Sequence, residues 1–372
     1  MRQNFIIKLI NKRPLLFSFI ILITLLFVIN KVSKIFLEVT KFEKRNNIDF
    51  IEKVYGKDNA EEYAKVISEQ TTTLKYKPFV EFTEHYRLGD FTSVSNFGNR
   101  CNQNYIIICK EPSGGKEEIW VFGGSTVFGY GVKNDETITS YIEKITKNKF
   151  KVINFGSGFY YSTQERILFQ NLLIELPSPH AAVFVDGYND FLKRHNYNET
   201  AISEAIRYKI NKTSKDDLID YFKERINRLN FVRLIKEKIF IEKGEKLKIF
   251  TSEGILKNSN LLKNNQEINS NTGEYFNVKV LNILQPVPIF HDSYDTSNIP
   301  DAFKLVDQDV DFINLKNAYE YFLNNSNHKY LNLSKLKINK PMFVDAVHYS
   351  KEFNMAIANE IVNYLDLISN EN

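Results

Sequence analysis

Ser125 follows a short apolar run and two glycines, in the order Ile119-Trp-Val-Phe-Gly-Gly-Ser125. The apolar residues predict a buried strand that breaks at the glycines, because paired glycines let the backbone turn tightly. A serine at the carboxyl edge of a buried sheet lies where open α/β sheets keep their chemistry. Its hydroxyl becomes a nucleophile only if a base lies within hydrogen-bond reach. A glycine-serine turn after a strand is usually just a turn, so this block alone does not predict a site.

Three further blocks place polar residues after apolar runs or near the C-terminus. One apolar run ends before Gly156, another is followed by Asn189, and Asp345 precedes His348 by three residues. Of the six histidines, only His348 has an acidic residue three positions before it. A histidine can take the proton of a serine if a carboxylate fixes its tautomer and stabilises the imidazolium. The ordered set therefore predicts a Ser-His-Asp site.

In this order the four blocks resemble those of the SGNH hydrolases, the serine esterases and acyltransferases that are also called GDSL-like. The resemblance covers roughly residues 118 to 365. It implies that Ser125 is the nucleophile, that His348 acts as base and then acid, and that Asp345 orients the histidine. It assigns the oxyanion hole to the backbone N–H groups of Ser125 and Gly156 and to the side-chain amide of Asn189. It implies neither a metal nor an organic cofactor.

Each of the later blocks also has a purely structural interpretation. Gly156 can simply terminate a strand, because glycine commonly punctuates loops. Asn189 can cap the helix that follows it, and Asp345 can cap the last helix, because both residue types favour the N-cap position. Capping and catalysis do not exclude one another at Asp345.

The chain departs from the family pattern at the residue before the nucleophile. The family name comes from Gly-Asp-Ser, whereas this chain has Gly123-Gly124-Ser125. The missing Asp is not a member of the triad, so the nucleophile is retained. Its loss can change how the serine loop is braced, and it leaves the class of substrate open.

An uncharged apolar run near the N-terminus bears on where this chemistry takes place. Residues 15–29 form a run of fifteen residues flanked by basic residues on both sides. The run is short against the roughly 20 residues that span a bilayer, but flanking lysines can snorkel. A cleaved signal peptide lacks a small-x-small cleavage site here, and nothing nearby would cover a core helix. We therefore predict a transmembrane signal-anchor over residues 15–32, preceded by a basic flank over residues 1–14.

The predicted anchor makes the chain a single-pass membrane protein, with the lipid bilayer as a partner of residues 15–32. Basic residues are about equally frequent on the two sides, so the positive-inside rule orients the segment poorly. Because no other spanning segment is found in the sequence, we expect the N-terminus inside. The catalytic domain is then outside the cytoplasm, in a periplasmic or extracellular position.

After the anchor, residues 33–117 are interpreted as a membrane-proximal stalk and lead-in. Residues 118–372 alternate apolar runs with helical stretches, which predicts a parallel sheet with crossover helices. The resemblance makes this domain an SGNH-type three-layer α/β/α sandwich. Residues 199–277 exceed what the minimal fold needs and are interpreted as an insertion, helical at first and then an Asn-rich mobile loop over residues 254–273. The last strand is expected at residues 311–315.

Composition excludes some partners and leaves one question open. The 49 basic and 45 acidic residues are too balanced to predict nucleic-acid binding. Cys101 and Cys109 are the only cysteines. They can form a disulfide or remain two buried thiols, and sequence alone does not decide. With no histidine close by in sequence they do not have the spacing of a zinc site.

Together these observations predict a membrane-anchored serine esterase. It would cleave an acyl ester, such as an acetyl ester, from a cell-surface or exported glycan through an acyl-enzyme, and a small acyl ester is an alternative substrate. Two other functions fit the same fold: a glycan O-acyltransferase that uses the same triad, and a non-catalytic glycan-binding or assembly protein. Retention of Ser125, Asp345 and His348 together argues against the non-catalytic function, whereas fold alone would not.

Overall fold

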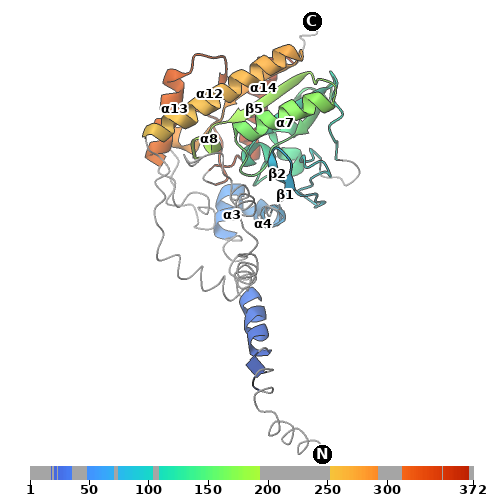
Figure 1. Ribbon diagram of the computed structural model, residues 1–372. Coiled ribbons are helices and arrows are strands. Elements are labelled where there is room, and N and C mark those ends of the chain that lie inside the picture. The colour runs from blue at the N-terminus through green and yellow to red at the C-terminus, as the bar shows by residue number, and fades with distance from the viewer. Residues whose placement is uncertain are drawn as a thin grey trace, which may run out of the picture. The chain divides into compact units, whose positions relative to one another are not determined.

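A computed structural model describes residues 18, 21–22, 24–35, 48–70, 74–103, 109–192, 252–291, 312–345 and 347–367. The chain divides into two compact units, one of residues 1–44 and 206–246 and the other of residues 45–205 and 247–372. In the first unit, the described residues up to residue 35 are helical. The second unit holds the sheet and all four predicted site blocks (Figure 1).

The predicted membrane anchor is not supported. Among the described helices, none is both long enough and apolar enough to cross a membrane. The prediction of a single-pass membrane protein anchored through residues 15–32 is therefore wrong, and the bilayer loses its support as a partner. The physical reason is length, because the uncharged run of fifteen residues is shorter than the roughly 20 that a bilayer requires.

A five-stranded sheet forms the centre of the second unit (Figure 1). Its strands lie in the order β4-β3-β5-β6-β7, and all neighbouring pairs are parallel. The strands are β3 (Glu118–Gly123), β4 (Lys151–Asn154), β5 (Ala181–Asp186), β6 (Lys279–Leu284) and β7 (Leu331–Asn332). This confirms the predicted parallel α/β sheet. The chain runs from β3 to β4 on one side and then to β5 on the other, so the carboxyl end of β3 is a topological switch point, where such sheets bind ligands.

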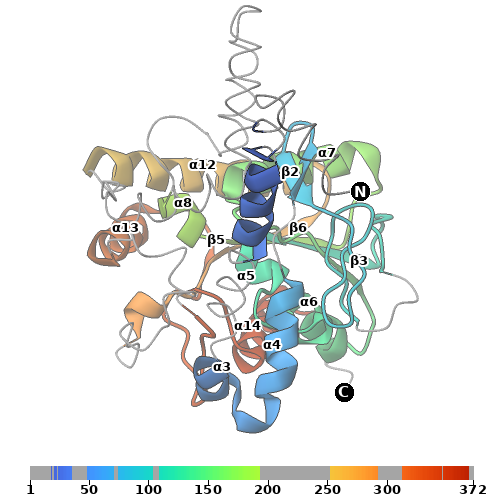
Figure 2. The ribbon, with the colours of Figure 1, turned by 90° about the horizontal axis from the view of Figure 1, so that it is seen from below.

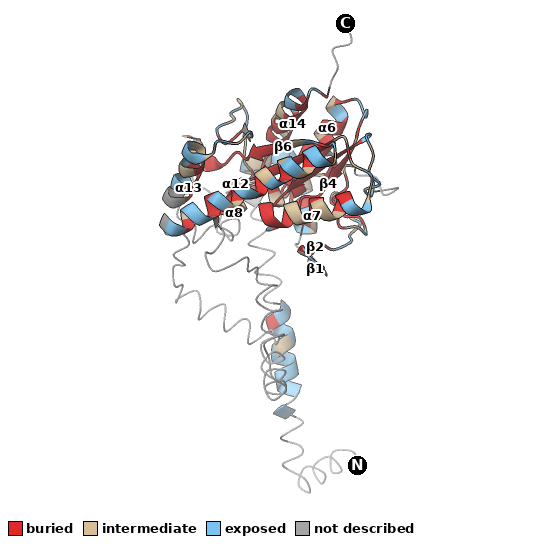
Figure 3. Cartoon of the chain, turned by 45° about the horizontal axis from the view of Figure 1, so that its top comes forward, coloured by how far each residue is buried: buried red, intermediate tan, exposed pale blue. Residues whose placement is uncertain are grey.

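Helices cover both faces of this sheet. Successive side chains of a strand point to opposite faces, so Val121 of β3 joins one apolar core and Phe122 joins the other. The first core is completed by α6 (Ile138–Ile145) and α14 (Lys351–Leu365), and the second by α7 (Ser162–Glu175). Figure 2 shows α6 and α14 on one side of the sheet and α7 and α12 (Ser252–Tyr275) on the other. Figure 3 shows that α7 and α12 are buried toward the sheet and exposed on their outer faces.

Two expectations about the second half of the domain are wrong. Residues 254–273 are not a loop but lie within α12, and some of the amide side chains of this helix find partners inside the fold. Asn265 Nδ2, for example, donates to Ser162 Oγ at 2.8 Å and to Thr163 Oγ1 at 2.9 Å. Residues 311–315 are not the last strand, because α13 begins at Phe312.

The spacing of apolar residues explains α13 (Phe312–Asn325). Its buried residues Leu315, Ala318, Tyr319 and Phe322 recur every three or four positions, which is the period of a helix with one buried face. They pack with α8 (Tyr188–Leu192) and α12 in a third apolar cluster. The described last strand of the sheet is the short β7.

The lead-in segment contributes to the same compact unit as the sheet. Val80 and Phe82 pack into the core beside Trp120 of β3. Within this segment β1 pairs with β2 in an antiparallel hairpin. The elements of the lead-in are α3 (Ile48–Tyr55), η1 (Lys57–Asn59), α4 (Ala60–Glu69), β1 (Leu74–Lys77) and β2 (Glu81–Glu84), and the remaining short helices of the unit are α5 (Ser125–Phe128), η2 (Asn134–Glu136) and η3 (Pro288–Phe290).

The two cysteines form a disulfide. Cys101 and Cys109 have their Cα atoms 4.9 Å apart, and their sulfur atoms are bonded. Of the two alternatives that the sequence left open, the structure therefore has the disulfide. It lies in the lead-in, after the hairpin of β1 and β2 and before β3.

Candidate active site

Ser125 is the first residue of α5, a single helical turn that begins directly after β3. The side chain is half-buried, whereas the next three residues are buried. Because the first N–H groups of a helix have no intrahelical acceptor, the N–H of Ser125 is free of helical bonding at the same edge of the sheet. The serine thus lies at the carboxyl end of β3, where the sequence analysis expected it.

Asp345 and His348 form a close pair on the loop before α14. Asp345 Oδ2 lies 2.6 Å from His348 Nδ1, and the two side chains are only 16% and 12% exposed. Asp345 Oδ1 also accepts from the backbone N–H of Val347 at 2.8 Å and of His348 at 2.7 Å. Burial alone would raise the pKa of the Asp345 carboxyl, but the charge of His348 and these hydrogen bonds hold its pKa below the ordinary value.

An ionised Asp345 fixes the tautomer of the histidine. Its carboxylate accepts a hydrogen bond from Nδ1–H, so Nε2 of neutral His348 carries the lone pair. Nε2 is buried and has no hydrogen-bond partner among the described residues. A buried imidazole nitrogen without a hydrogen-bond partner lowers the stability of the fold, so its presence calls for a functional explanation. The pair is thus arranged to accept a proton at Nε2.

Contacts on both sides of Ser125 and His348 hold their two segments together. The Thr126 side chain hydrogen-bonds the phenol of Tyr349, so the residues that follow the serine and the histidine are partners. The Tyr349 hydroxyl also donates to the carbonyl of Pro286 at 2.9 Å. The ring of Tyr130, just beyond α5, has its centroid 5.5 Å from that of His348. The structure therefore brings these two blocks onto neighbouring segments, far apart as they are in the sequence.

The loop after α5 also touches the loop that carries Asp345. A Cβ atom built on Gly131 would lie 2.6 Å from Val344 Cγ2. The hydroxyl of Tyr55, which ends α3 of the lead-in, donates to the carbonyl of Gly131 at 2.8 Å. The lead-in segment thus supports the contact between the serine loop and the aspartate loop.

Asn189 lies beside the residue that precedes the nucleophile. A Cβ atom built on Gly124 would be 2.5 Å from Asn189 Nδ2. The same Nδ2 donates one hydrogen to the carbonyl of Tyr160 at 2.7 Å. A carboxamide has two N–H donors, so the second is available to a ligand at Ser125.

Asn189 does not cap a following helix, because it lies inside α8, and the neighbouring Asp190 anchors that helix. Its Oδ1 accepts from the backbone N–H of Ser162 at 3.1 Å and from the Ser162 hydroxyl at 2.5 Å. Its Oδ2 accepts from the N–H of Gly187 at 3.3 Å. These bonds tie α8 to the start of α7, so Asn189 is not needed for that purpose.

The proposed oxyanion role of Gly156 does not fit its surroundings. Its N–H donates to Asn154 Oδ1 at 2.9 Å and is therefore engaged inside the protein. A Cβ atom at this position would lie 2.2 Å from the backbone nitrogen of Phe128. The residue is glycine because the end of β4 presses against the backbone of α5, and we assign it this packing role in place of the oxyanion role.

Glu84 and Tyr130 are site residues that the sequence analysis missed. The fully buried Glu84 accepts from the N–H of Gly158 at 3.1 Å and is hydrogen-bonded by the Tyr130 side chain. Burial raises the pKa of Glu84 despite the opposing effects of the Gly158 N–H and the nearby arginines. Tyr130 thus links a carboxyl of the lead-in to the ring of His348. Neither residue belongs to one of the four blocks, so no motif could have pointed to them.

A buried pair of carboxyl groups lies behind α8. Glu165 of α7 and Asp186 at the end of β5 are 1% and 2% exposed, and each lies close enough to affect the ionisation of the other. Burial, with the charge of Asp190 nearby, raises the pKa of both groups well above their ordinary values. Two carboxylates that are buried near one another repel, so the pair binds a proton more readily than free carboxyl groups do.

The described residues contain no group of three or more histidine, cysteine, aspartate or glutamate side chains that could hold a metal ion. The arrangement of Ser125, His348 and Asp345, with a donor at Asn189, is suited to nucleophilic attack on an acyl carbonyl.

No protein-family model matches the chain, and no curated protein is similar to it. Solved structures with a similar fold include an acetyl xylan esterase (14% identity, TM-score 0.35, 66% of this chain and 98% of that one). A carbohydrate acetylesterase family member from Sinorhizobium meliloti has 15% identity and a TM-score of 0.33, over 67% of this chain and 98% of that one. A GDSL-like lipase from Bacteroides thetaiotaomicron has 14% identity and a TM-score of 0.34, over 67% and 88%. TM-scores this low support no inference about function by themselves.

Proposed function

We propose that this protein is an SGNH-type serine esterase that cleaves an acyl ester through an acyl-enzyme. The observation that carries the proposal is the 2.6 Å contact between Asp345 Oδ2 and His348 Nδ1, with Nε2 unpartnered among the described residues. A histidine oriented in this way, on a segment in contact with the serine helix, is what activation of a serine requires. A cap for the last helix would not need it, since Ser350 is the N-cap of α14 and accepts from the N–H of Phe353.

In the first half-reaction the Ser125 hydroxyl attacks the acyl carbonyl carbon, and its proton passes to His348 Nε2. The carbonyl π electrons move to oxygen, which becomes the oxyanion of a tetrahedral intermediate. Collapse of this intermediate breaks the bond to the alcohol oxygen, which takes the proton from Nε2. In the second half-reaction water replaces the alcohol in the same sequence and releases the free acid and Ser125.

Two donors are available for the oxyanion. The backbone N–H of Ser125 lies at the start of α5, and the Asn189 amide has one hydrogen left after its bond to Tyr160. Donors that are already oriented act on charge that develops only in the transition state, which is why they accelerate the reaction. We leave Gly156 out of the hole because its N–H is engaged by Asn154.

We propose an acyl group such as acetyl on a glycan as the substrate. The basis is the resemblance of the four sequence blocks to SGNH esterases, and the balanced charge of the chain (49 basic and 45 acidic residues) is compatible with a neutral substrate. A glycan hydroxyl can replace water as the acceptor with the same triad, which would make the enzyme a transferase.

Labelling with a fluorophosphonate tests the proposal, because this reagent reacts with an activated serine. We expect stoichiometric labelling of the purified chain and none of the Ser125→Ala variant. Ser157→Ala is the matched control, since Ser157 follows the neighbouring strand β4 and its buried hydroxyl has no partner among the described residues. Equal labelling of wild type and Ser125→Ala, or no labelling of folded wild type, would contradict the proposal. Release of free acetate from an acetylated oligosaccharide would establish hydrolysis, and formation of a new acetylated glycan in its place would establish transfer.

A further inference from the structure

Arg100 is a fully buried arginine that lies outside the four site blocks. Arg100 is 1% exposed. Its backbone N–H donates a 3.1 Å hydrogen bond to the carbonyl of Asn154, the last residue of β4. The side chain extends toward the turn that follows α5. Guanidinium Nη1 donates to the carbonyls of Phe128 at 2.8 Å and Gly129 at 2.5 Å, and Nη2 donates to the carbonyl of Val132 at 2.7 Å.

The carbonyls of Phe128 and Gly129 belong to the end of the helix that begins with the nucleophile, and that of Val132 belongs to the turn that follows it. A helix leaves its last carbonyls without intrahelical donors. A helix of one turn, such as α5, has few hydrogen bonds of its own and depends on contacts with the rest of the fold. A positive charge at the carboxyl end of a helix is favourable. Because the fork of a guanidinium carries five donors in fixed positions, Arg100 can hold several of these carbonyls at once.

Two further side chains hold the same turn. Asn154 Nδ2 donates to the carbonyl of Val127 at 2.8 Å. Gln70, directly after α4, donates from Nε2 to the carbonyl of Val132 at 2.8 Å and accepts the N–H of Gly131 at 2.6 Å. The carboxyl end of α5 is thus bound by side chains from both β4 and the lead-in.

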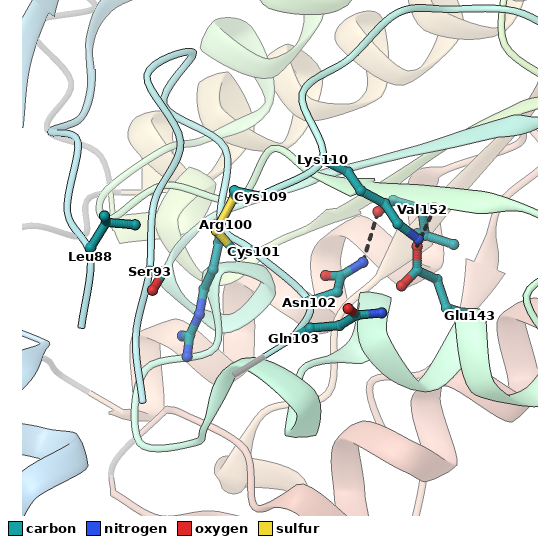
Figure 4. Close-up of a pocket in the computed structure, with 10 residues that line it drawn as sticks. All are labelled: Leu88, Ser93, Arg100, Cys101, Asn102, Gln103, Cys109, Lys110, Glu143 and Val152. Atoms are coloured by element: carbon teal, nitrogen blue, oxygen red, sulfur yellow. Dashed lines mark hydrogen bonds and ion pairs between the residues drawn. A yellow bond between two sulfur atoms is a disulfide. The ribbon is translucent and has the colours of Figure 1, made fainter. Parts of the chain in front are cut away.

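The backbone on either side of Arg100 is itself fixed. Figure 4 shows Arg100 beside the disulfide of Cys101 and Cys109, next to a cavity of about 20 Å³. This volume holds at most a single water molecule, so it is not a substrate site. Asn102 Nδ2 donates to the carbonyl of Val152 at 2.7 Å, and Lys110 pairs with Glu143 of α6 at 2.9 Å.

We propose that Arg100 is a positioning residue for the nucleophile: it holds α5 so that the Ser125 hydroxyl faces His348 and the Ser125 N–H faces the oxyanion. This inference rests on the proposed function. The family pattern has an aspartate before the serine, whereas here the space in front of Gly124 is taken by Asn189. The serine helix is therefore braced from its carboxyl end, by the guanidinium.

Desolvation by burial lowers the pKa of Arg100 to about 9. The guanidinium therefore remains charged at neutral pH. Its removal would leave the buried carbonyls that it binds without their donors. A lysine keeps the charge but supplies a single ammonium without the planar fork. It can bind one or two of the three carbonyls, so Arg100→Lys tests the geometry of the contact apart from its charge.

The test compares Arg100→Lys with wild type by the rate of fluorophosphonate labelling, by kcat and KM on p-nitrophenyl acetate, and by thermal unfolding. A misplacement of the nucleophile by about 1 Å costs about 10²-fold in rate, so we expect labelling and kcat to fall by about this factor. We expect KM to change less than about twofold, because the variant alters transition-state geometry and not uniform binding. The midpoint of the pH–rate profile should stay in place, since the contact of His348 with Asp345 is untouched.

Arg166→Lys is the matched control. Arg166 is a partly buried arginine of α7 that bonds to Asn265 and Gln170, away from the turn after α5. Its replacement should leave labelling and kcat within about twofold of wild type. Gln70→Ala, which removes three contacts at the same turn without removing a charge, should slow labelling severalfold and serves if Arg100→Lys does not fold.

A folded Arg100→Lys with wild-type labelling would overturn the inference. A rate loss that only follows the unfolded fraction, and disappears well below the unfolding temperature, would also overturn it, because it would show a purely structural role. If Arg100→Lys does not fold and Gln70→Ala labels at the wild-type rate, the inference fails as well. Failure of the proposed function is distinguishable, because wild type would then not be labelled at Ser125 at all.

Discussion

The amide nitrogen of Asn189 occupies the space in which a side chain at position 124 would lie. A Cβ atom on Gly124 would be 2.5 Å from Asn189 Nδ2 and 3.1 Å from the carbonyl of Tyr160 that this nitrogen binds. The glycine and the asparagine are therefore complementary. An aspartate before the serine, as in the family pattern, and this position of the Asn189 amide exclude one another.

Asn189→Ala should lower kcat by about 10²-fold and leave KM nearly unchanged, because the amide acts on charge that is present mainly in the transition state. The fold should persist, because Asp190 and not Asn189 ties α8 to α7. Steady-state kinetics on p-nitrophenyl acetate, with thermal unfolding as the control for folding, measure the effect. A variant that unfolds at once would show that Asn189 is a structural residue.

Gly124→Ala should impair the action of the Asn189 amide on the oxyanion indirectly. The added Cβ meets the end of the Asn189 side chain, which can move away, so we expect a loss of kcat similar to that of Asn189→Ala with little loss of stability. The double variant Gly124→Ala/Asn189→Ala provides the sharper test. If the two substitutions act through the same donor, the double variant should be no slower than Asn189→Ala, which is a strong departure from additivity.

Additive losses in this double-mutant cycle would contradict the shared mechanism. They would mean that Gly124 acts through its own backbone conformation and not through the space it leaves for Asn189. Gly115→Ala offers a control for the substitution itself, because a Cβ at Gly115 meets no atom within 4 Å, although its φ of +101° will cost some stability.

The parts of the fold that were predictable are those with a strong local signal. The strand before Ser125 and the strand after α7 are uninterrupted apolar runs, and both are central strands of the parallel sheet. The helical stretches expected between the apolar runs correspond, after β3 and β4, to α6, preceded by the short η2, and to α7. Asp345 and His348 were found because their spacing is unusual among the histidines of the chain, and the structure places the two side chains in contact.

What escaped prediction depends on contacts between distant residues. The asparagines of α12 suggest a loop by propensity, yet the helix packs into the fold and Asn265 finds a partner in Ser162, so tertiary contacts override local preference. Gly156 was assigned a donor role that its bond to Asn154 excludes. Arg100 gave no signal at all, because a buried arginine and an exposed one are identical in a single sequence.

Asp345→Asn should lower kcat by about 10⁴-fold, because an asparagine amide that donates to Nδ1 stabilises the wrong tautomer of His348. Fluorophosphonate labelling should slow in parallel, whereas KM should change little. The backbone bonds from Val347 and His348 can still end on the Oδ1 of asparagine, so the loop should keep its shape. A variant that retains labelling within tenfold of wild type would show that Asp345 does not orient the base.

The buried carboxyl pair of Glu165 and Asp186 predicts how stability depends on pH. In the unfolded chain Glu165 and Asp186 have pKa values of about 4.3 and 3.9, whereas burial raises the pKa of both in the folded state. Above about pH 4 the folded state therefore holds more protons than the unfolded state. The free energy of unfolding then decreases as the pH rises, until it passes the raised pKa values of the pair.

Glu165→Gln should flatten this dependence. Glutamine has nearly the same shape as glutamate but does not titrate, so the substitution removes one of the two titrating groups. We expect the slope of unfolding free energy against pH, measured by urea denaturation between about pH 5 and 8, to be less negative than in wild type. Glu175→Gln, on the exposed end of the same helix, should leave the slope unchanged. Identical slopes for Glu165→Gln and wild type would show that the pair takes up no proton on folding, and that Glu165 and Asp186 are both ionised inside the domain.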